Sequence, residues 1–158
     1  LLSNFLTDRT AVMGEDGACV IPCIAQAQSM YVMDKCYYNY RYNTESATKK
    51  KKPFPWECPK IINMHIISKT DIKAFDFRDQ IYRKIVHDLF NVIISQFYSQ
   101  QSYCKIKSNV LYQMQDEFYD TAINRAVFKN SLKARLMIEV LRKKLIFIIY
   151  IYAKLRKN

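Results

Sequence analysis

Glycine is nearly missing from this 158-residue chain, and proline is missing from its larger part. The only glycines are Gly14 and Gly17, and neither glycine nor proline follows Pro59. Strand-rich domains need such turn residues about every 8–12 positions. The absence excludes a fold built mainly of strands. It predicts an all-α protein, a single domain over residues 1–158 organised as a bundle of about four helices.

Histidine occurs only at His65 and His87, which leaves few candidates for proton transfer. His87 precedes Asp88 on a predicted helix, where neighbouring side chains point apart and do not orient one another. The lack of glycine also excludes a glycine-rich loop that would hold phosphate groups. The sequence therefore predicts a protein that is not an enzyme, with no catalytic residue and no evident small-molecule substrate.

Cysteine is present at five positions, an odd number that fits poorly with a closed set of disulfides: Cys19, Cys23, Cys36, Cys58 and Cys104. We expect reduced, mostly buried thiols. Cys19 and Cys23 have the spacing of half a zinc site, but no second close pair follows them. The sequence therefore predicts no metal and no cofactor. No signal-peptide pattern precedes Cys19.

The order of apolar and polar segments predicts where the helices lie. Residues 1–21 are expected to be an irregular N-terminal segment, and residues 43–69, which hold four lysines in a row and three prolines, a linker. The four predicted helices begin at or near Pro22, Thr70, Asn109 and Ser131, and the first two end near Tyr42 and Tyr98.

The same periodicity predicts which side chains form the core. Apolar residues at steps of three and four define one face of each of the last three predicted helices. The predicted core residues are Ile72, Phe75, Tyr82, Val86, Leu89, Ile93, Phe97, Leu111, Met114, Phe118, Leu136, Leu141, Leu145, Ile148 and Tyr152.

Positive charge is in excess, with a net charge of +11, and it is unevenly distributed. Residues 1–60 carry eight basic and six acidic side chains, and residues 61–128 carry eight and seven. Residues 129–158 carry nine basic side chains against Glu139 alone, a net charge of +8. Such a segment attracts an acidic protein surface, nucleic acid or an anionic membrane surface; the alternative is a solvated face that only confers solubility.

Nine apolar or aromatic residues, Leu145 to Ala153, lie between basic flanks near the end of the sequence. A membrane-spanning helix needs about 20 apolar residues, so we expect no transmembrane span. A helix that is apolar on all sides is normally buried, with its basic ends reaching the solvent. The alternative is a helix that packs one face on the protein and offers the other to a partner or an anionic membrane.

Two groups of cations and the only tryptophan are the candidates for partner binding. The run 49–52 is typical of nuclear import signals and of phosphate-binding loops, and equally of a solvated loop. Trp56 lies between prolines, where its ring could stack on bases or cover the helices as a lid. The predicted partner-binding residues are Arg142, Lys143, Lys144, Lys154, Arg156, Lys157, Lys49, Lys50, Lys51, Lys52 and Trp56.

These features favour a non-enzymatic helical binding or assembly protein whose basic C-terminal helix docks on an acidic protein or nucleic-acid surface. An intracellular location, nuclear in view of the run 49–52, is favoured over secretion. The alternative is a secreted or acrosomal basic helical protein, rich in tyrosine, that acts on membranes or extracellular coats. Two disulfides would indicate this alternative, and five free thiols the interior of the cell.

Overall fold

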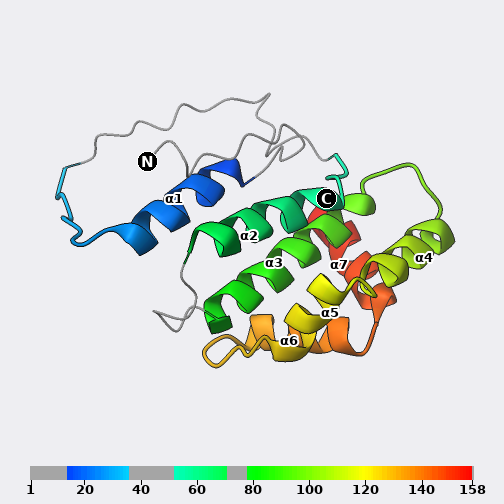
Figure 1. The fold of residues 1–158 in the computed structure, drawn as a ribbon. Coiled ribbons are helices and arrows are strands. Elements are labelled where there is room, and N and C mark those ends of the chain that lie inside the picture. Colours follow the sequence, from blue (N-terminus) through cyan, green and yellow to red (C-terminus); the bar gives the residue numbers. More distant parts are fainter. Residues whose placement is uncertain (1–13, 36–51, 71–77, 158) are drawn as a thin grey trace.

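The computed structural model of the chain describes residues 14–35, 52–70 and 78–157 (Figure 1). Within these ranges the chain forms α-helices and no strand, which confirms the all-α class. The helices are shorter and more numerous than the four expected. They are α1 (Glu15–Gln26), α2 (Glu57–Lys69), α3 (Arg78–Gln96), α4 (Tyr103–Gln113), α5 (Glu117–Arg125), α6 (Leu132–Arg142) and α7 (Ile146–Lys157).

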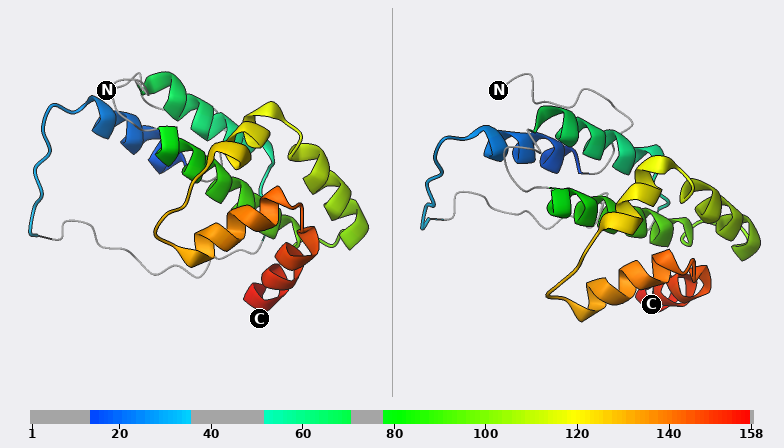
Figure 2. Two further views of the ribbon diagram at one scale, coloured as in Figure 1. Left: turned by 90° about the horizontal axis from the view of Figure 1, so that it is seen from below. Right: turned by 60° about the horizontal axis from the view of Figure 1, so that its bottom comes forward.

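Helix α3, 19 residues long, lies at the centre of the arrangement. It packs against α2, α5 and α7, while α1 packs on α2 and α6 packs on α5 and α7. Helices α1 and α2 run in the same direction and α3 returns antiparallel to them, as Figures 1 and 2 show. Helices α6 and α7 lie on the side of α3 away from α1 and form one edge of the molecule (Figure 2).

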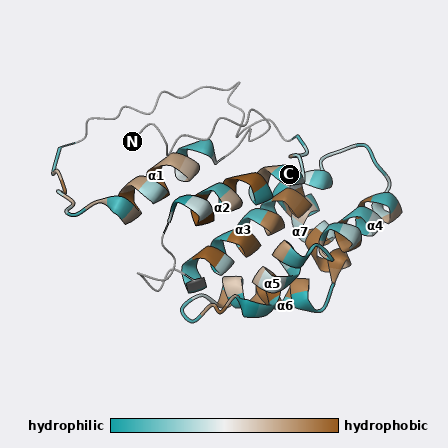
Figure 3. Cartoon of the chain, in the orientation of Figure 1, coloured by the Kyte–Doolittle hydropathy of each residue, from teal (hydrophilic) through white to brown (hydrophobic). Residues whose placement is uncertain are grey.

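The core surrounds α3, where apolar residues run along the helix in the middle of the molecule (Figure 3). Full burial of one such side chain stabilises the fold by about 1.5–3 kcal/mol. Burial confirms six predicted core residues: Val86, Leu89, Ile93, Phe97, Met114 and Leu141. Four more pack against the core while partly exposed: Tyr82, Leu111, Phe118 and Tyr152.

Three predicted core residues are exposed. Leu136 is 59% exposed, Leu145 is 41% exposed and Ile148 is 47% exposed. All three lie on α6, on α7 or between them, where the predicted helix is in fact two helices with different buried faces. Ile72 and Phe75 lie outside the described residues.

Helix α1 begins inside the segment that was expected to be irregular and ends well before Tyr42. It starts after Gly14, whose φ of 91° is readily available to glycine, and Glu15 and Asp16 complement the positive end of the helix dipole. Pro22, expected in the first turn, lies within the helix and is buried. Residues 27–35 are not helical, and residues 36–42 lie outside the described part.

Helix α2 lies in the segment that was predicted to be a linker, and this prediction was wrong. Pro59 is the third residue of the helix, where the missing N–H group would have no partner within the helix in any case. Cys58, Ile62 and Ile66 are buried against the core. A proline-rich segment was therefore mistaken for the end of helical structure when it marks a helix start.

The third predicted helix is divided into α4 and α5, and it begins earlier than Asn109. Ser102 caps α4 by accepting a hydrogen bond from the backbone N–H of Lys105. Asp116 caps α5 by accepting one from the N–H of Phe118. Both caps are polar residues of the kind that start helices. Ser102 lies in a polar stretch that was interpreted as a break between helices, and Asp116 was overlooked because the apolar pattern of Met114 and Phe118 continues across it.

The fourth predicted helix begins where it was expected, with Ser131 as its N-cap, but ends at Arg142. Lys144 has a φ of 52°. The N–H of Lys144 donates to the carbonyl of Leu141, and the N–H of Leu145 donates to that of Val140. This is the Schellman pattern, in which glycine usually takes the left-handed position. The helix therefore ends with no glycine to indicate it.

The segment before α2 is held to the core by polar contacts. The N–H of Phe54 donates to Ser95 Oγ, and Gln96 Nε2 donates to the Phe54 carbonyl. The buried Tyr119 donates its hydroxyl to the carbonyl of Trp56 at 3.0 Å. Trp56 itself packs against the core. These contacts join α2, α3 and α5 at one end of α2.

We expect Lys144→Gly to raise the free energy of unfolding by about 1 kcal/mol, because glycine adopts a left-handed backbone without steric cost. Lys143 is the matched control. Its φ of −83° is ordinary for any residue, so Lys143→Gly should lower stability. Urea denaturation of both variants measures the difference, and equal effects of the two substitutions would contradict the assigned turn.

We expect Tyr119 to make the fold sensitive to alkali. Burial, and then the nearby Asp116 carboxylate, raise the pKa of Tyr119 above its ordinary value of 10.0. The neutral phenol therefore stabilises the fold below pH 10, and this stabilisation is lost as the pH rises above that value. Above about pH 10, wild-type stability should fall with pH more steeply than that of Tyr119→Phe, by up to about 1.4 kcal/mol per pH unit.

Urea denaturation at a series of pH values measures this difference. The control is Tyr112→Phe, which removes the same hydroxyl group from an exposed side chain. Parallel profiles for the wild type and Tyr119→Phe would show that Tyr119 ionises without opposing the fold.

Candidate partner-binding surface

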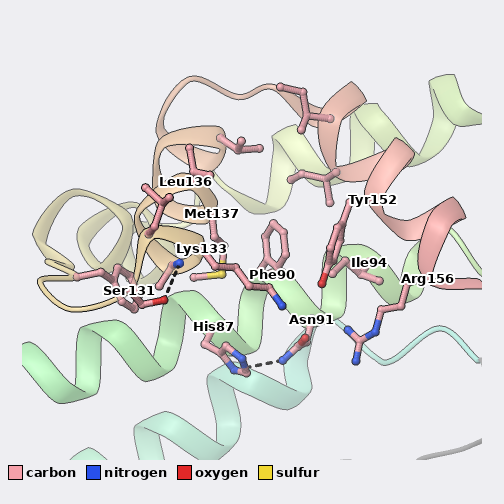
Figure 4. Close-up of a pocket in the computed structure, with 16 residues that line it drawn as sticks. His87, Phe90, Asn91, Ile94, Ser131, Lys133, Leu136, Met137, Tyr152 and Arg156 are labelled. Carbon is pink, nitrogen blue, oxygen red and sulfur yellow. Dashed lines mark hydrogen bonds between the residues drawn. The ribbon is translucent and has the colours of Figure 1, made fainter.

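A groove of about 830 Å³ separates α6 and α7 above α3 (Figure 4). We call it the α3–α6–α7 groove, and the pair of helices with the turn 143–145 between them the α6–α7 hairpin. Most of the residues that line the groove are apolar. They are His87, Phe90, Asn91 and Ile94 of α3, Phe128 and Ser131 before α6, Leu132, Lys133, Ala134, Leu136, Met137 and Val140 of α6, and Ile148, Ile149, Tyr152 and Arg156 of α7.

The floor of the groove is one face of α3. Residues 87, 90, 91 and 94 follow the three- and four-residue steps that bring side chains to the same face of a helix. Phe90 and Ile94 provide the apolar part, and the Phe90 ring lies 6.0 Å from the Tyr152 ring of α7, centroid to centroid. His87 and Asn91 form the polar edge, with 3.2 Å between Asn91 Nδ2 and His87 Nδ1.

Leucines of α6 form one wall of the groove. Leu132 and Leu136 are four residues apart and are 70% and 59% exposed. The opposite side of α6 buries Ile138 and Leu141. One side of α6 therefore packs against the core, and the other side presents a row of apolar side chains to the groove and the solvent.

Helix α7 forms the other wall, and it is apolar on almost every side. Ile146, Ile149 and Ala153 are buried. The exposed large apolar residues of this helix are Phe147, Ile148, Ile151 and Leu155. The sequence left two alternatives for this segment, a helix buried on all sides and a helix packed by one face. In the structure α7 packs by one face and its other faces are exposed. Among the described helices, none is both long and apolar enough to cross a membrane.

Cations surround the apolar side chains of the hairpin. Lys143, Lys144, Lys154 and Arg156 are exposed, and none of them forms an ion pair within the described residues. Two further contacts involve aromatic rings: Lys133 Nζ lies 5.9 Å from the centre of the Tyr152 ring, and Lys154 Nζ lies 5.5 Å from that of Tyr150. The side chain of Lys157 lies outside the described residues.

Arg142 differs from the other predicted cations because its guanidinium group is bound within the protein. Its Nε donates to the carbonyl of Ile123, and its Nη2 donates to the carbonyls of Asn124 and Ala126. Its Nη1 lies 3.1 Å from Glu139, the only carboxylate of residues 129–158. Arg142 thus joins the end of α6 to the end of α5, where carbonyl groups have no helical partner.

The second group of predicted residues lies apart from the hairpin. Lys49, Lys50 and Lys51 lie outside the described residues, and Lys52 is exposed. Trp56 packs against the core and does not line the α3–α6–α7 groove. The structure therefore brings together the cations of the hairpin, and it places Trp56 at another site.

The cysteines do not gather into a site. Cys58 is buried, Cys19 and Cys23 are half-buried, and Cys104 is exposed, so among the described cysteines the expectation of mostly buried thiols was wrong. None of the four described cysteines forms a disulfide, and Cys36 lies outside the described part. Within the described residues no cluster of cysteine, histidine and carboxylate side chains could hold a metal ion.

The acidic residues near the start of α5 stabilise the helix and its contact with α2. Lys60 Nζ lies 2.5 Å from Asp116 Oδ2. This hydrogen bond holds the pKa of Asp116 below its usual value. Asp120 accepts a hydrogen bond from Asn124, one turn further along α5.

Sequence reasoning missed the groove because no short motif encodes it. The signal was present only in part: Leu132 and Leu136 repeat at a four-residue step, and the apolar run of α7 exceeds what one buried face needs. No family model, curated protein or solved structure matches this chain. We therefore infer function from the geometry and charge of the hairpin.

We expect Arg142→Ala to lower the free energy of unfolding by about 2 kcal/mol, because it leaves the carbonyls at the end of α5 without their charged donor. Lys143→Ala, at the neighbouring exposed position, should change stability by less than about 0.5 kcal/mol. Arg142→Lys should recover only part of the loss, since an ammonium group lacks the planar fork of donors. Urea denaturation measures all three, and similar values for Arg142→Ala and Lys143→Ala would contradict the structural role.

Proposed function

We propose that this protein is a non-enzymatic binding protein that docks on an acidic macromolecule through the basic α6–α7 hairpin. The observation that carries the proposal is the combination of exposed cations and exposed apolar side chains on the same two helices. Residues 129–158 have a net charge of +8, and their only carboxylate is already paired with Arg142. The positive field of the hairpin is therefore available to a partner.

An acidic protein surface suits the hairpin better than nucleic acid does. Phe147, Ile151 and Leu155 stand between the cations on α7 and are exposed. Interfaces between proteins bury apolar side chains at their centre and place charges around them. Interfaces with nucleic acid are much more polar, because their main contacts are to phosphate groups. The exposed apolar residues are therefore best explained by a protein partner.

The test uses two labelled polyanions, a poly-glutamate peptide and a DNA duplex, with fluorescence anisotropy over a range of salt concentrations. We expect the 158-residue chain to bind poly-glutamate, and the affinity to fall as salt is added. The double variant Lys154→Ala with Arg156→Ala should weaken this binding by about three- to tenfold, since each exposed ion pair contributes up to about 1 kcal/mol.

The control removes two exposed lysines from another helix, Lys105→Ala with Lys107→Ala on α4, and changes the net charge by the same amount. It should leave the affinity within about twofold of wild type. An equal loss in both double variants would mean that only the total charge matters, and would refute docking through the hairpin.

The DNA arm distinguishes the two kinds of partner. If the hairpin cations bind phosphate groups, the slope of log affinity against log salt should become shallower by about 1.8 in the hairpin variant. Tighter binding to DNA than to poly-glutamate, together with this change of slope, would identify nucleic acid as the partner and overturn the preference for protein.

A further inference from the structure

We propose that the α3–α6–α7 groove receives a single amphipathic helix of the partner protein, with acidic residues on either side of its apolar face. This inference rests on the proposed function and specifies the partner of the same hairpin.

The groove has the shape of a space between packed helices that one more helix could occupy. Helix α6 packs on α5 and α7, and α7 packs on α3. Helices α3, α6 and α7 therefore surround the groove but do not fill it. Two helices in contact lie about 8–10 Å apart, and an amphipathic helix in an apolar groove is a recurring mode of peptide recognition. A guest helix would bury Phe90 and Ile94 of the floor, which are the side chains at its base (Figure 4).

The spacing of the walls fits helical partners. Leu132, Leu136 and Val140 repeat every four residues along α6, and Ile148 and Tyr152 repeat in the same way along α7. Each row forms a ridge against which the side chains of another helix can interdigitate. The 11 residues of α6 extend over about 16 Å, which corresponds to about three turns of a guest helix.

The charge of the groove selects an acidic guest. The charged side chains that line it are Lys133 and Arg156, one on each wall, and no carboxylate lines it. Carboxylates flanking the apolar face of a guest would meet these two cations and exclude a basic partner by repulsion. A second copy of this chain is disfavoured for the same reason, because two hairpins, each with a net charge of +7, would face each other.

A small apolar molecule fits the surface less well than a helix. The apolar area does not stop at the groove but continues over α7 to Phe147, Ile151 and Leu155. Apolar patches of this kind on a folded protein mark sites of protein or membrane contact. A partner that covers the groove and the adjoining face of α7 must be larger than one ligand molecule.

The experiment uses a designed peptide of about 14 residues, long enough for nearly four turns. Leucines at positions i, i+3, i+4, i+7 and i+8 form its apolar face, and glutamates occupy the flanks. One control peptide has the same composition in a scrambled order, and a second has lysine in place of glutamate. Fluorescence anisotropy with the 158-residue chain should detect binding of the first peptide, and binding at least about tenfold weaker for both controls.

The matched pair of protein variants is Ile148→Asp and Ile24→Asp. Ile148 lines the groove and is 47% exposed, while Ile24 is 50% exposed on α1. Both substitutions introduce the same charge at a half-exposed helical isoleucine, so they differ only in place. Ile148→Asp should weaken peptide binding by about tenfold or more, and Ile24→Asp by less than about twofold.

Leu136→Asp provides a second test on the opposite wall, and circular dichroism establishes that each variant is folded. The proposal is overturned if the scrambled peptide binds as tightly as the amphipathic one, or if Ile148→Asp and Ile24→Asp behave alike. Either result leaves the poly-glutamate test unaffected, so failure of the groove is distinguishable from failure of hairpin docking.

The same variants test two other occupants of the groove, a second copy of this chain and a membrane surface. Ile148→Asp would convert a dimer to a monomer in sedimentation analysis if a second copy filled the groove. It would abolish binding to vesicles of phosphatidylserine and phosphatidylcholine if the groove faced a membrane. Either result would overturn the proposal, and a monomer that binds vesicles no differently after the substitution would support it.

Discussion

The enclosure of α3 is the constraint on which the rest of the structure depends. Ile85, Val86, Leu89 and Ile93 are almost completely buried, because α2 and α5 cover one part of the helix and α7 another. Small helical units that contact one another in this way derive most of their stability from packing and little from intrinsic helix propensity. The six described helices other than α3 are each 13 residues or shorter, so they need α3, directly or through a neighbour, to remain folded.

The position of the α6–α7 hairpin follows from how its two helices are attached. Arg142 joins α6 to the last carbonyls of α5, and the left-handed turn at Lys144 reverses the chain into α7. Helix α7 then returns to α3. Because α6 is held at α5 and α7 at α3, the space between them stays open and becomes the α3–α6–α7 groove. The same contacts leave the basic side chains of the hairpin on the outside.

The sequence predicts composition-dependent features well and boundaries poorly. The near-absence of glycine and proline correctly indicated helices, and the four-residue steps around Leu89 and Ile93 correctly indicated the core. The predicted helix boundaries were wrong where the same residue type is compatible with two local structures. Pro59 can end a helix or begin one, and Lys144 takes a conformation for which glycine is the usual signal. The exposed leucine at 136 could not be distinguished from a core residue, because helical periodicity records that a face is apolar and not what covers it.

The site of the only tryptophan has a consequence for how this protein can be observed. Trp56 packs against the core and does not line the α3–α6–α7 groove, and its backbone carbonyl accepts a hydrogen bond from the hydroxyl of Tyr119. Its ultraviolet emission depends on the polarity around the indole ring, so it reports whether α2, α3 and α5 are still assembled. Occupation of the hairpin should leave that emission nearly constant, whereas loss of the fold should move it to longer wavelengths. The fluorescence of Trp56 therefore distinguishes binding of a partner from unfolding of the protein.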